Sequence, residues 1–302
     1  MILAALKGLL YLSSILLIGA GVFRFFIEKQ NSELLERRTL LSLLSLGAII
    51  LAATTVSEIA YVLYDLLGSY DLTTFWDFVI STNHGKAASI RLLVLILLSL
   101  LISLAPDTWW SKQAFLLLGL GLISSFSAIS HGASMAGSSL FVADLIHFLA
   151  AGAWAGPIFY LAYSQHWLDK ANLYKPALEQ ISRIGLLSVM ILFASGFFMS
   201  LSYMGEPEEF VYSNYGFSLF TKLGMILIIL ALAIYNRFVL MNRLASTGEV
   251  LDFRETIRWE AALLSLVFIA TGVLTTRALP HSVTASLNPA ENLLNLIQSF
   301  WR

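Results

Sequence analysis

HGASMAGSSLFVADLIHFLAAGAWAG, residues 131–156, is the stretch on which the interpretation of this chain depends. It joins the end of one long apolar run to the start of the next, yet it holds two of the five histidines, a methionine and a carboxylate. Polar side chains inside an apolar span are costly and usually face the interior of a helix bundle. The stretch therefore predicts a chemically active corner in a membrane scaffold.

The composition of the whole chain supports that scaffold. Of its 302 residues, 58% are hydrophobic and 12% are charged, and the mean hydropathy is +0.80. A soluble domain carries about twice this charged fraction. The absence of cysteine excludes disulfides, thiolate zinc sites and cysteine-bound iron–sulfur clusters. No basic tail or nucleotide-binding loop occurs, so we expect neither nucleic-acid binding nor an ATP-driven pump.

The apolar runs predict an all-α protein that crosses the membrane eight times. We expect the spans near residues 2–27, 39–67, 84–105, 113–130, 141–163, 181–204, 217–239 and 257–279. A tail from His281 to Arg302 is too short to span, and its apolar residues have the spacing of an amphipathic surface helix.

The charged residues in the connections predict the orientation of the chain. Basic residues concentrate in the odd-numbered connections: Lys29, Arg37, Arg38, Lys112, Lys170, Lys175, Arg183, Arg243, Arg254 and Arg258. Acidic residues concentrate in the second and sixth connections: Asp71, Asp77, Glu206, Glu208 and Glu209. Basic connections remain on the cytoplasmic side, so we expect both termini and the 131–156 corner on the extracytoplasmic side.

A repeated pattern divides the predicted bundle into two parallel four-helix halves, residues 1–138 and 139–280. The third span opens with Asn83-His84-Gly85 and has Arg91 six residues after the glycine. The seventh opens with Asn214-Tyr215-Gly216 and has Lys222 at the same offset. Four spans separate the two patterns, so equivalent helices run in the same direction.

His147 is the strongest candidate for a functional side chain. Asp144 and Trp154 lie on the same predicted helix face, and Ala151 and Gly152 between them allow another helix to approach closely. A carboxylate one turn from an imidazole can fix its tautomer and strengthen it as a metal ligand. The alternative is a structural Asp–His hydrogen bond that holds two helices together.

Further candidates gather near the predicted extracytoplasmic surface. His131 and Met135 follow the fourth span, and an imidazole with a thioether suits Cu(I). The alternative for these two is an ordinary loop. His84 and His281 are expected at the same surface. Met199 and Met204 approach it from the sixth span, where packing is the usual role of methionine.

Three charged residues are expected inside the bundle: Glu58, Arg91 and Lys222. The two cations have long apolar stems and can extend towards the surface, or they can pair with Glu58 and Asp144. Such groups suit either buried ion pairs or a path for protons or ions.

These residues resemble the copper resistance protein D (CopD) family of bacterial inner-membrane proteins. The resemblance is carried by the glycine-then-Arg91 start of the third span and by the Asp144–His147–Trp154–Gly156 run. It continues with Tyr215-Gly216-x5-Lys222, Asn236-Arg237 and Thr275-Thr276. The resemblance implies eight spans, a copper ion as the bound species, and copper movement inward from the periplasmic side.

The chain also departs from the family pattern. Ser130 stands before His131 where the family often has glycine, and Trp154-Ala155-Gly156-Pro157 replaces Trp-x-Gly-Gly. Some members carry a fused extracellular copper-binding domain, whereas this chain starts with a span. The resemblance therefore implies a separate soluble carrier of the CopC type as partner.

Three functions are compatible with these residues, and none of them is enzymatic. The first is copper binding and transport through an external site and a deeper site at His147. The second is delivery or sensing of copper without transport. The third is a redox protein with b-type haem, which needs two histidines facing each other at similar depth. Only His147 is predicted well inside a span, so transport is the preferred hypothesis.

Overall fold

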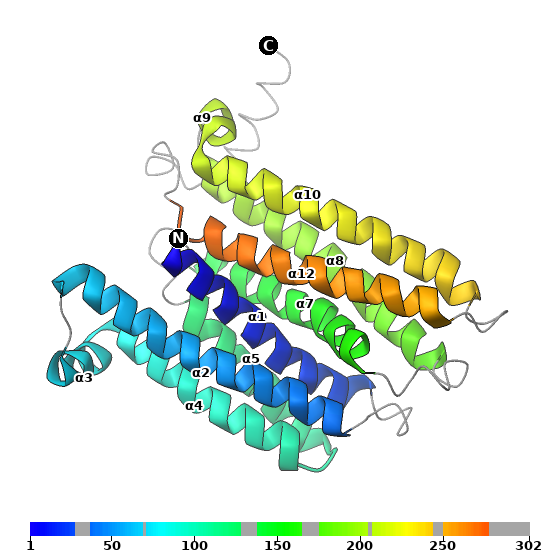
Figure 1. Ribbon diagram of the computed structural model, residues 1–302, viewed down its shortest axis with the longest axis horizontal. Coiled ribbons are helices and arrows are strands. Elements are labelled where there is room, and N and C mark those ends of the chain that lie inside the picture. Colours follow the sequence, from blue (N-terminus) through cyan, green and yellow to red (C-terminus); the bar gives the residue numbers. More distant parts are fainter. Residues whose placement is uncertain are drawn as a thin grey trace.

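The computed structural model describes residues 1–27, 37–68, 71–127, 138–164, 175–204, 207–243 and 250–277. Within these ranges the chain is helical, with long antiparallel helices lying roughly along one direction (Figure 1). The first half contributes α1 (Ile2–Val22), η1 (Phe23–Ile27), α2 (Arg37–Leu67), α3 (Leu72–Ser81), α4 (Asn83–Leu104) and α5 (Trp109–Ser127). The second contributes α7 (Ser138–Tyr163), α8 (Lys175–Met204), α9 (Pro207–Tyr212), α10 (Asn214–Tyr235), η4 (Asn236–Leu240) and α12 (Val250–Leu274).

Seven of the described helices are long and apolar enough to cross a membrane, and the protein is a multi-pass membrane protein. They coincide with the predicted spans except the fourth. That span corresponds to α5, which begins with Trp109, Trp110 and Lys112 and is therefore less apolar. The all-helical class is confirmed, whereas the count of eight stays a prediction.

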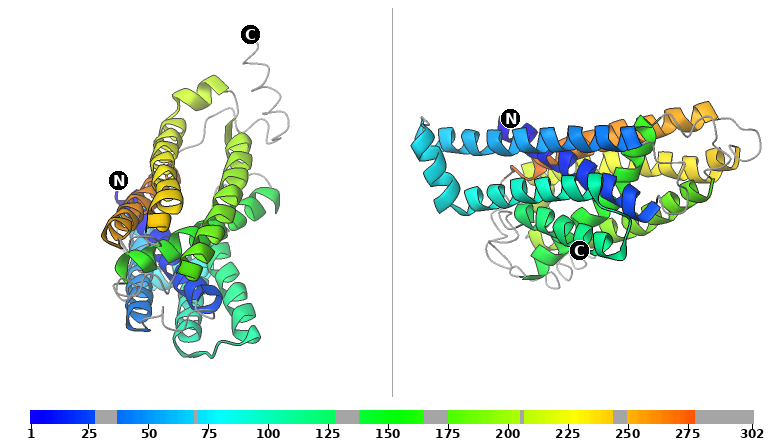
Figure 2. Two further views of the ribbon diagram at one scale, coloured as in Figure 1. Left: turned by 90° about the vertical axis from the view of Figure 1, so that its right-hand side faces the viewer. Right: turned by 90° about the horizontal axis from the view of Figure 1, so that it is seen from below.

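Helix α1 occupies the centre of the bundle, where it packs against α2, α7 and α12 (Figures 1 and 2). Small residues allow the close approach to α7. A Cβ on Gly19 would lie 2.2 Å from the Cα of Gly156, and a Cβ on Gly152 would lie 2.6 Å from Ile18. The prediction that the small residues of α7 admit another helix is confirmed, and that helix is α1.

The starts of α4 and α10 share one local structure. Thr82 caps α4 by accepting a hydrogen bond from the Gly85 backbone N–H, and Ser213 caps α10 by accepting from Gly216. Each glycine lies against the short helix before it: a Cβ would come within 2.5 Å of a backbone oxygen of α3 at Gly85 and within 2.0 Å of one of α9 at Gly216. Hydroxyl caps of this kind satisfy helix N–H groups that have no partner in the helix.

The two ends of the bundle differ in charge. Cations such as Arg37, Lys112, Arg243 and Arg258 lie where α1 gives way to α2 and where α12 begins, on the right in Figure 1. We call this the basic end. The opposite end carries the N-terminus, α3 and α9, with Asp71, Asp77 and Glu208.

Candidate functional site

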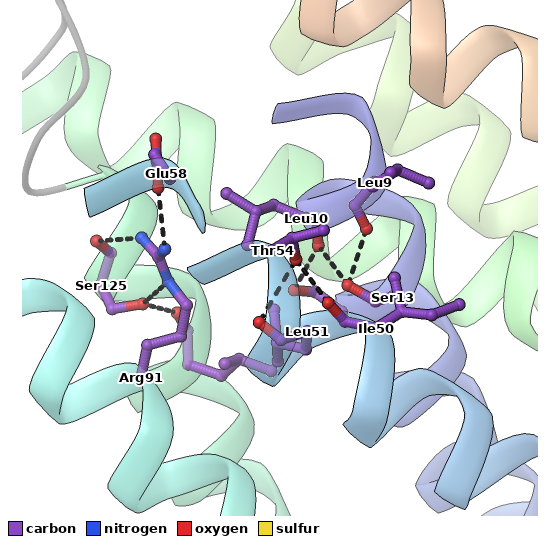
Figure 3. A network of polar contacts seen from close by, with 11 residues as sticks. Leu9, Leu10, Ser13, Ile50, Leu51, Thr54, Glu58, Arg91 and Ser125 are labelled. Atoms are coloured by element: carbon purple, nitrogen blue, oxygen red, sulfur yellow. Dashed lines mark hydrogen bonds and ion pairs between the residues drawn. The ribbon is translucent and has the colours of Figure 1, made fainter. Parts of the chain in front are cut away.

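The best-defined polar contact inside the bundle is an ion pair between α2 and α4. The guanidinium of Arg91 lies 3.3 Å from the carboxylate of Glu58, measured from Nη1 to Oε2 (Figure 3). The Arg91 side chain is 1% exposed and that of Glu58 is 9% exposed. Of the alternatives that the sequence leaves open, pairing across the bundle is therefore confirmed for Arg91.

The end of α5 completes the surroundings of Arg91. Its Nε donates to the Ser125 hydroxyl at 3.3 Å, and its Nη2 donates to the Ser125 carbonyl at 3.4 Å. The guanidinium carbon lies 4.0 Å from the centre of the Phe126 ring. These contacts join α4, which carries Arg91, to both α2 and α5.

Asp144 does not contact His147. Its Oδ2 accepts a hydrogen bond of 2.6 Å from the hydroxyl of Ser127, the last residue of α5. The expectation that this carboxylate orients the imidazole, or forms an Asp–His hydrogen bond, is wrong. The physical reason is the bundle geometry: α5 packs against α7 and offers a hydroxyl to Asp144, while the imidazole points towards α8.

A serine orients His147 instead. Its Nδ1 lies 2.9 Å from the Ser195 hydroxyl oxygen on α8. That hydroxyl has one proton, which it donates to the Ile191 carbonyl at 2.6 Å. With the proton in that bond, Ser195 accepts from the ring, which corresponds to the tautomer with the imidazole proton on Nδ1. In that tautomer Nε2 has a lone pair that could bind a metal ion, the arrangement that a second partner commonly imposes on histidine ligands.

Small residues on α8 make room for the aromatic rings of α7. A Cβ on Gly196 would lie 3.2 Å from the Cε1 of His147, and one on Gly185 would lie 3.3 Å from the Cδ1 of Trp154. Both rings therefore lie against α8, as the shared helix face predicts. Trp154 lies two turns after His147 on α7, where its side chain is buried and packs in the core.

Lys222 is half-buried on α10 and lies within electrostatic range of Asp144. In the portion of the chain that the structure covers, its ammonium forms no ion pair. The expected pairing of Lys222 with Asp144 therefore takes the form of a neighbouring charge and not of a direct contact.

Two other predicted residues are placed near this region. Met199 is half-buried and lies one turn after Ser195 on α8, which brings it towards the level of Asp144. His84 is exposed at the start of α4. It borders a shallow pocket lined by Glu58, Ile59, Val62, Phe78, His84, Ala88 and Arg91.

The predicted outer level cannot be compared with the structure. His131, Met135 and His281 lie outside the described residues, and so does the 281–302 tail. The backbone of Met204 is described but its side chain is not. Within the described ranges, no three His, Asp or Glu side chains gather as they would around a metal ion.

Sequence reasoning missed the three serines that organise this region, Ser125, Ser127 and Ser195. Each lies in an apolar helix, where serine commonly bonds to the backbone of its own helix. Ser125 and Ser195 do this as well as contacting Arg91 and His147. Only the pairing of helices reveals their second role, so a single sequence carries no signal for it.

The helices and their buried ionisable groups define a multi-pass membrane protein with charged and hydrogen-bonding side chains inside the bundle. Two family models match the chain. The one described as "Copper resistance protein D-like, N-terminal domain" matches residues 1–141, and the one described as "Copper resistance protein D" matches residues 175–274. The chain belongs to the copper resistance protein D family.

A curated relative supports the same assignment. "Copper resistance protein D" of Pseudomonas syringae pv. tomato is 24% identical over 277 residues, which cover 86% of this chain and 89% of that protein. No solved structure matches the chain. The resemblance inferred from the residues is confirmed, and it supports a copper-related function in a membrane.

Proposed function

We propose that this protein binds copper ions on the extracytoplasmic side of a bacterial inner membrane and moves them inward. The observation that carries the proposal is the contact of the His147 Nδ1 with Ser195 inside an apolar helix bundle, which supports Nε2 as the metal-binding atom. Asp144 lies one turn farther from the basic end, and Met199 lies at a similar level on α8. Nitrogen, oxygen and thioether donors together can hold copper in either common oxidation state.

The same proposal includes the layout of the whole chain. Eight spans form two parallel halves, residues 1–138 and 139–280, with both termini outside. The matching starts of α4 and α10 support the repeat. Copper would enter near His131, Met135, His84 and His281 before it reaches His147. A soluble carrier of the CopC type is the proposed donor at that surface.

Copper-dependent X-ray absorption of the purified protein tests the deeper step. In the wild type we expect nitrogen ligation of imidazole type, and His147→Ala should remove that ligand and abolish copper accumulation in cells. Ser195→Ala should weaken copper binding about tenfold to a hundredfold, since the loss of a partner that orients a histidine ligand has effects of that size. Unchanged accumulation in a normally expressed His147→Ala variant would contradict the proposed site.

Ser202→Ala is the matched control for Ser195→Ala. Both hydroxyls donate to a carbonyl one turn earlier in α8, but only Ser195 also contacts His147. We expect Ser202→Ala to leave copper affinity unchanged. Copper flux into sealed vesicles then separates the alternatives, because binding without flux favours delivery or sensing over transport.

A further inference from the structure

A second buried carboxylate lies outside the site described above. Glu260 is 4% exposed on α12. It lies ten residues after Val250, the first residue of α12. That distance is about 15 Å along a helix with a rise of 1.5 Å per residue. Glu260 is therefore deep in the bundle, in the half nearer the basic end, whereas Glu58 and Asp144 lie in the other half.

The contacts of Glu260 are neutral. The Asn236 side-chain amide donates to its Oε2 at 2.9 Å. The Asn236 carbonyl accepts a hydrogen bond of 2.5 Å from the Thr256 hydroxyl, which fixes the amide with its N–H groups towards the carboxyl group. Asn236 is the first residue of the π-helical segment η4. Such segments are frequent at functional sites because they change the direction of the side chains that follow them.

Glu260 has no cationic partner in the described part of the chain. The elements packed against α12 carry the charged or titratable groups Lys7, Asp144, His147, Lys222 and Arg237, and the tyrosines Tyr11, Tyr160, Tyr163, Tyr215 and Tyr235. The helix itself adds Asp252, Arg254, Glu255 and Arg258. No described cation lies within 4.0 Å of the Glu260 carboxylate, and the Arg237 guanidinium is bonded to Ser182 at 2.6 Å. Glu58, by contrast, has Arg91.

An ionised carboxylate in this position is unfavourable. Burial removes its hydration, and one amide hydrogen bond does not replace the stabilisation that water or a cation supplies. Burial therefore favours the neutral, protonated form of a carboxyl group that has no cation beside it. Ionisable residues of this kind inside membrane proteins commonly serve as proton relays.

We propose that Glu260 is a proton-exchanging residue of the membrane interior, which accepts and releases its proton towards the basic end. In the released state its O–H bond is broken, the proton has passed to water, and the Asn236 amide stabilises the carboxylate. Through this exchange, copper movement is coupled to the proton gradient. The coupling rests on the proposed transport function, whereas the proton exchange itself does not.

Infrared spectroscopy of the purified protein tests the protonation without copper. At neutral pH the wild type should show the carbonyl stretching band of a protonated carboxyl group, and that band should shift in heavy water because the proton exchanges. Glu260→Gln should remove this band. The matched control is Glu255→Gln, which changes an exposed acid of the same helix and should retain the band.

A second variant keeps the test informative if Glu260→Gln folds poorly. Asn236→Leu removes the hydrogen-bond donor but retains the acid, so the band should persist and move to higher frequency. Identical spectra of the wild type, Glu260→Gln and Asn236→Leu at neutral pH would overturn the proposal, because Glu260 would then be ionised. A carbonyl band that comes from Asp144 should be the same in the wild type, Glu260→Gln and Asn236→Leu, so it can be told apart from the band of Glu260.

Flux measurements in vesicles test the coupling separately. An imposed proton gradient should change the initial rate of copper uptake by the wild type severalfold, and Glu260→Gln should lose this dependence while it retains copper binding. Wild-type flux that ignores the gradient would overturn the coupling. A wild type that binds copper but moves none would contradict the proposed transport, while the infrared result would still decide the protonation of Glu260.

Discussion

In the proposed layout of two parallel halves, the helix pair α2–α4 corresponds to the helix pair α8–α10. The structure packs these two pairs differently. Of the apolar windows of α2 and α4, 44% and 39% are buried, compared with 11% and 6% for α8 and α10. Helix α2 packs against α4, with Glu58 and Arg91 joined between them. In the left view of Figure 2, α10 lies apart from α8. Arg237, just beyond α10, donates to Ser182 of α8.

The cations at the two corresponding positions show what this difference means. Arg91 and Lys222 both lie six residues after the glycine that starts their helix. Arginine remains charged under all ordinary conditions, and here it is fixed by an acid, a serine and an aromatic ring. Lysine is a flexible point charge, and Lys222 faces Asp144 without a direct ion pair. We infer that the first half mainly provides structure, whereas the second holds the groups that respond to a passing cation.

The largest effect should come from breaking the pair in the tightly packed half. Arg91→Met or Glu58→Gln alone leaves a buried partner without its counter-charge, which typically costs about 3–5 kcal/mol. The double variant removes both charges and should be more stable than the sum of the two single changes predicts. Unfolding of the four proteins in the same detergent measures this coupling. Strictly additive losses would show that the two side chains do not support each other.

A smaller effect is expected at the corresponding cation of the loosely packed half. Lys222→Met removes a positive charge near Asp144, so copper affinity should rise about tenfold, which corresponds to about 1.4 kcal/mol. Because Lys222 has no ion pair in the described chain, stability should change by less than about 1 kcal/mol. Isothermal titration with copper measures the affinity.

Two controls accompany Lys222→Met. Lys222→Arg retains the charge and should retain the wild-type affinity. Lys86→Met removes an exposed cation at the start of α4 and should have no effect on copper binding. A decrease in copper affinity in Lys222→Met would contradict the proposed opposition between this ammonium and the bound cation.

The fold class could be predicted because apolar runs of this length have few alternatives. The pairing of Arg91 with Glu58 was one of the outcomes that the sequence allowed, since buried charges in a membrane seek partners. The partner of His147 could not be predicted. Asp144 is its neighbour along α7, but Ser195 lies 48 positions away, and only the packing of α7 on α8 brings it to the ring.

A similar limit explains the overlooked residues near the basic end. Asn236 could be recognised as part of a family pattern, but its contact with Glu260 depends on how η4 packs against α12. Hydropathy finds helices one at a time, whereas the site consists of contacts between helices. Contacts such as these become visible only when the arrangement of the bundle is known.

The smallest effect concerns α3, the short helix that packs across the ends of α2 and α4. Asp71 caps it by accepting a hydrogen bond of 2.7 Å from the Thr74 backbone N–H. This bond, followed by one from the Thr73 hydroxyl, lowers the pKa of Asp71 from its ordinary value of 3.8. Because the folded-state pKa lies below the unfolded value, the stabilisation is present above the unfolded pKa and is lost as the pH falls through the folded pKa.

Hydrogen exchange of residues 72–81 measures that loss. In the wild type, amide protection of α3 should decrease in acid relative to Asp71→Asn, which retains a good cap without a titrating group. Asp71→Ala should lack the protection of the cap at every pH. Equal acid sensitivity in the wild type and Asp71→Asn would show that another group governs α3. A third result is that Asp71→Ala loosens α3 without changing the stability of the whole protein. That result would show that the Arg91–Glu58 pair holds α2 and α4 together without help from α3.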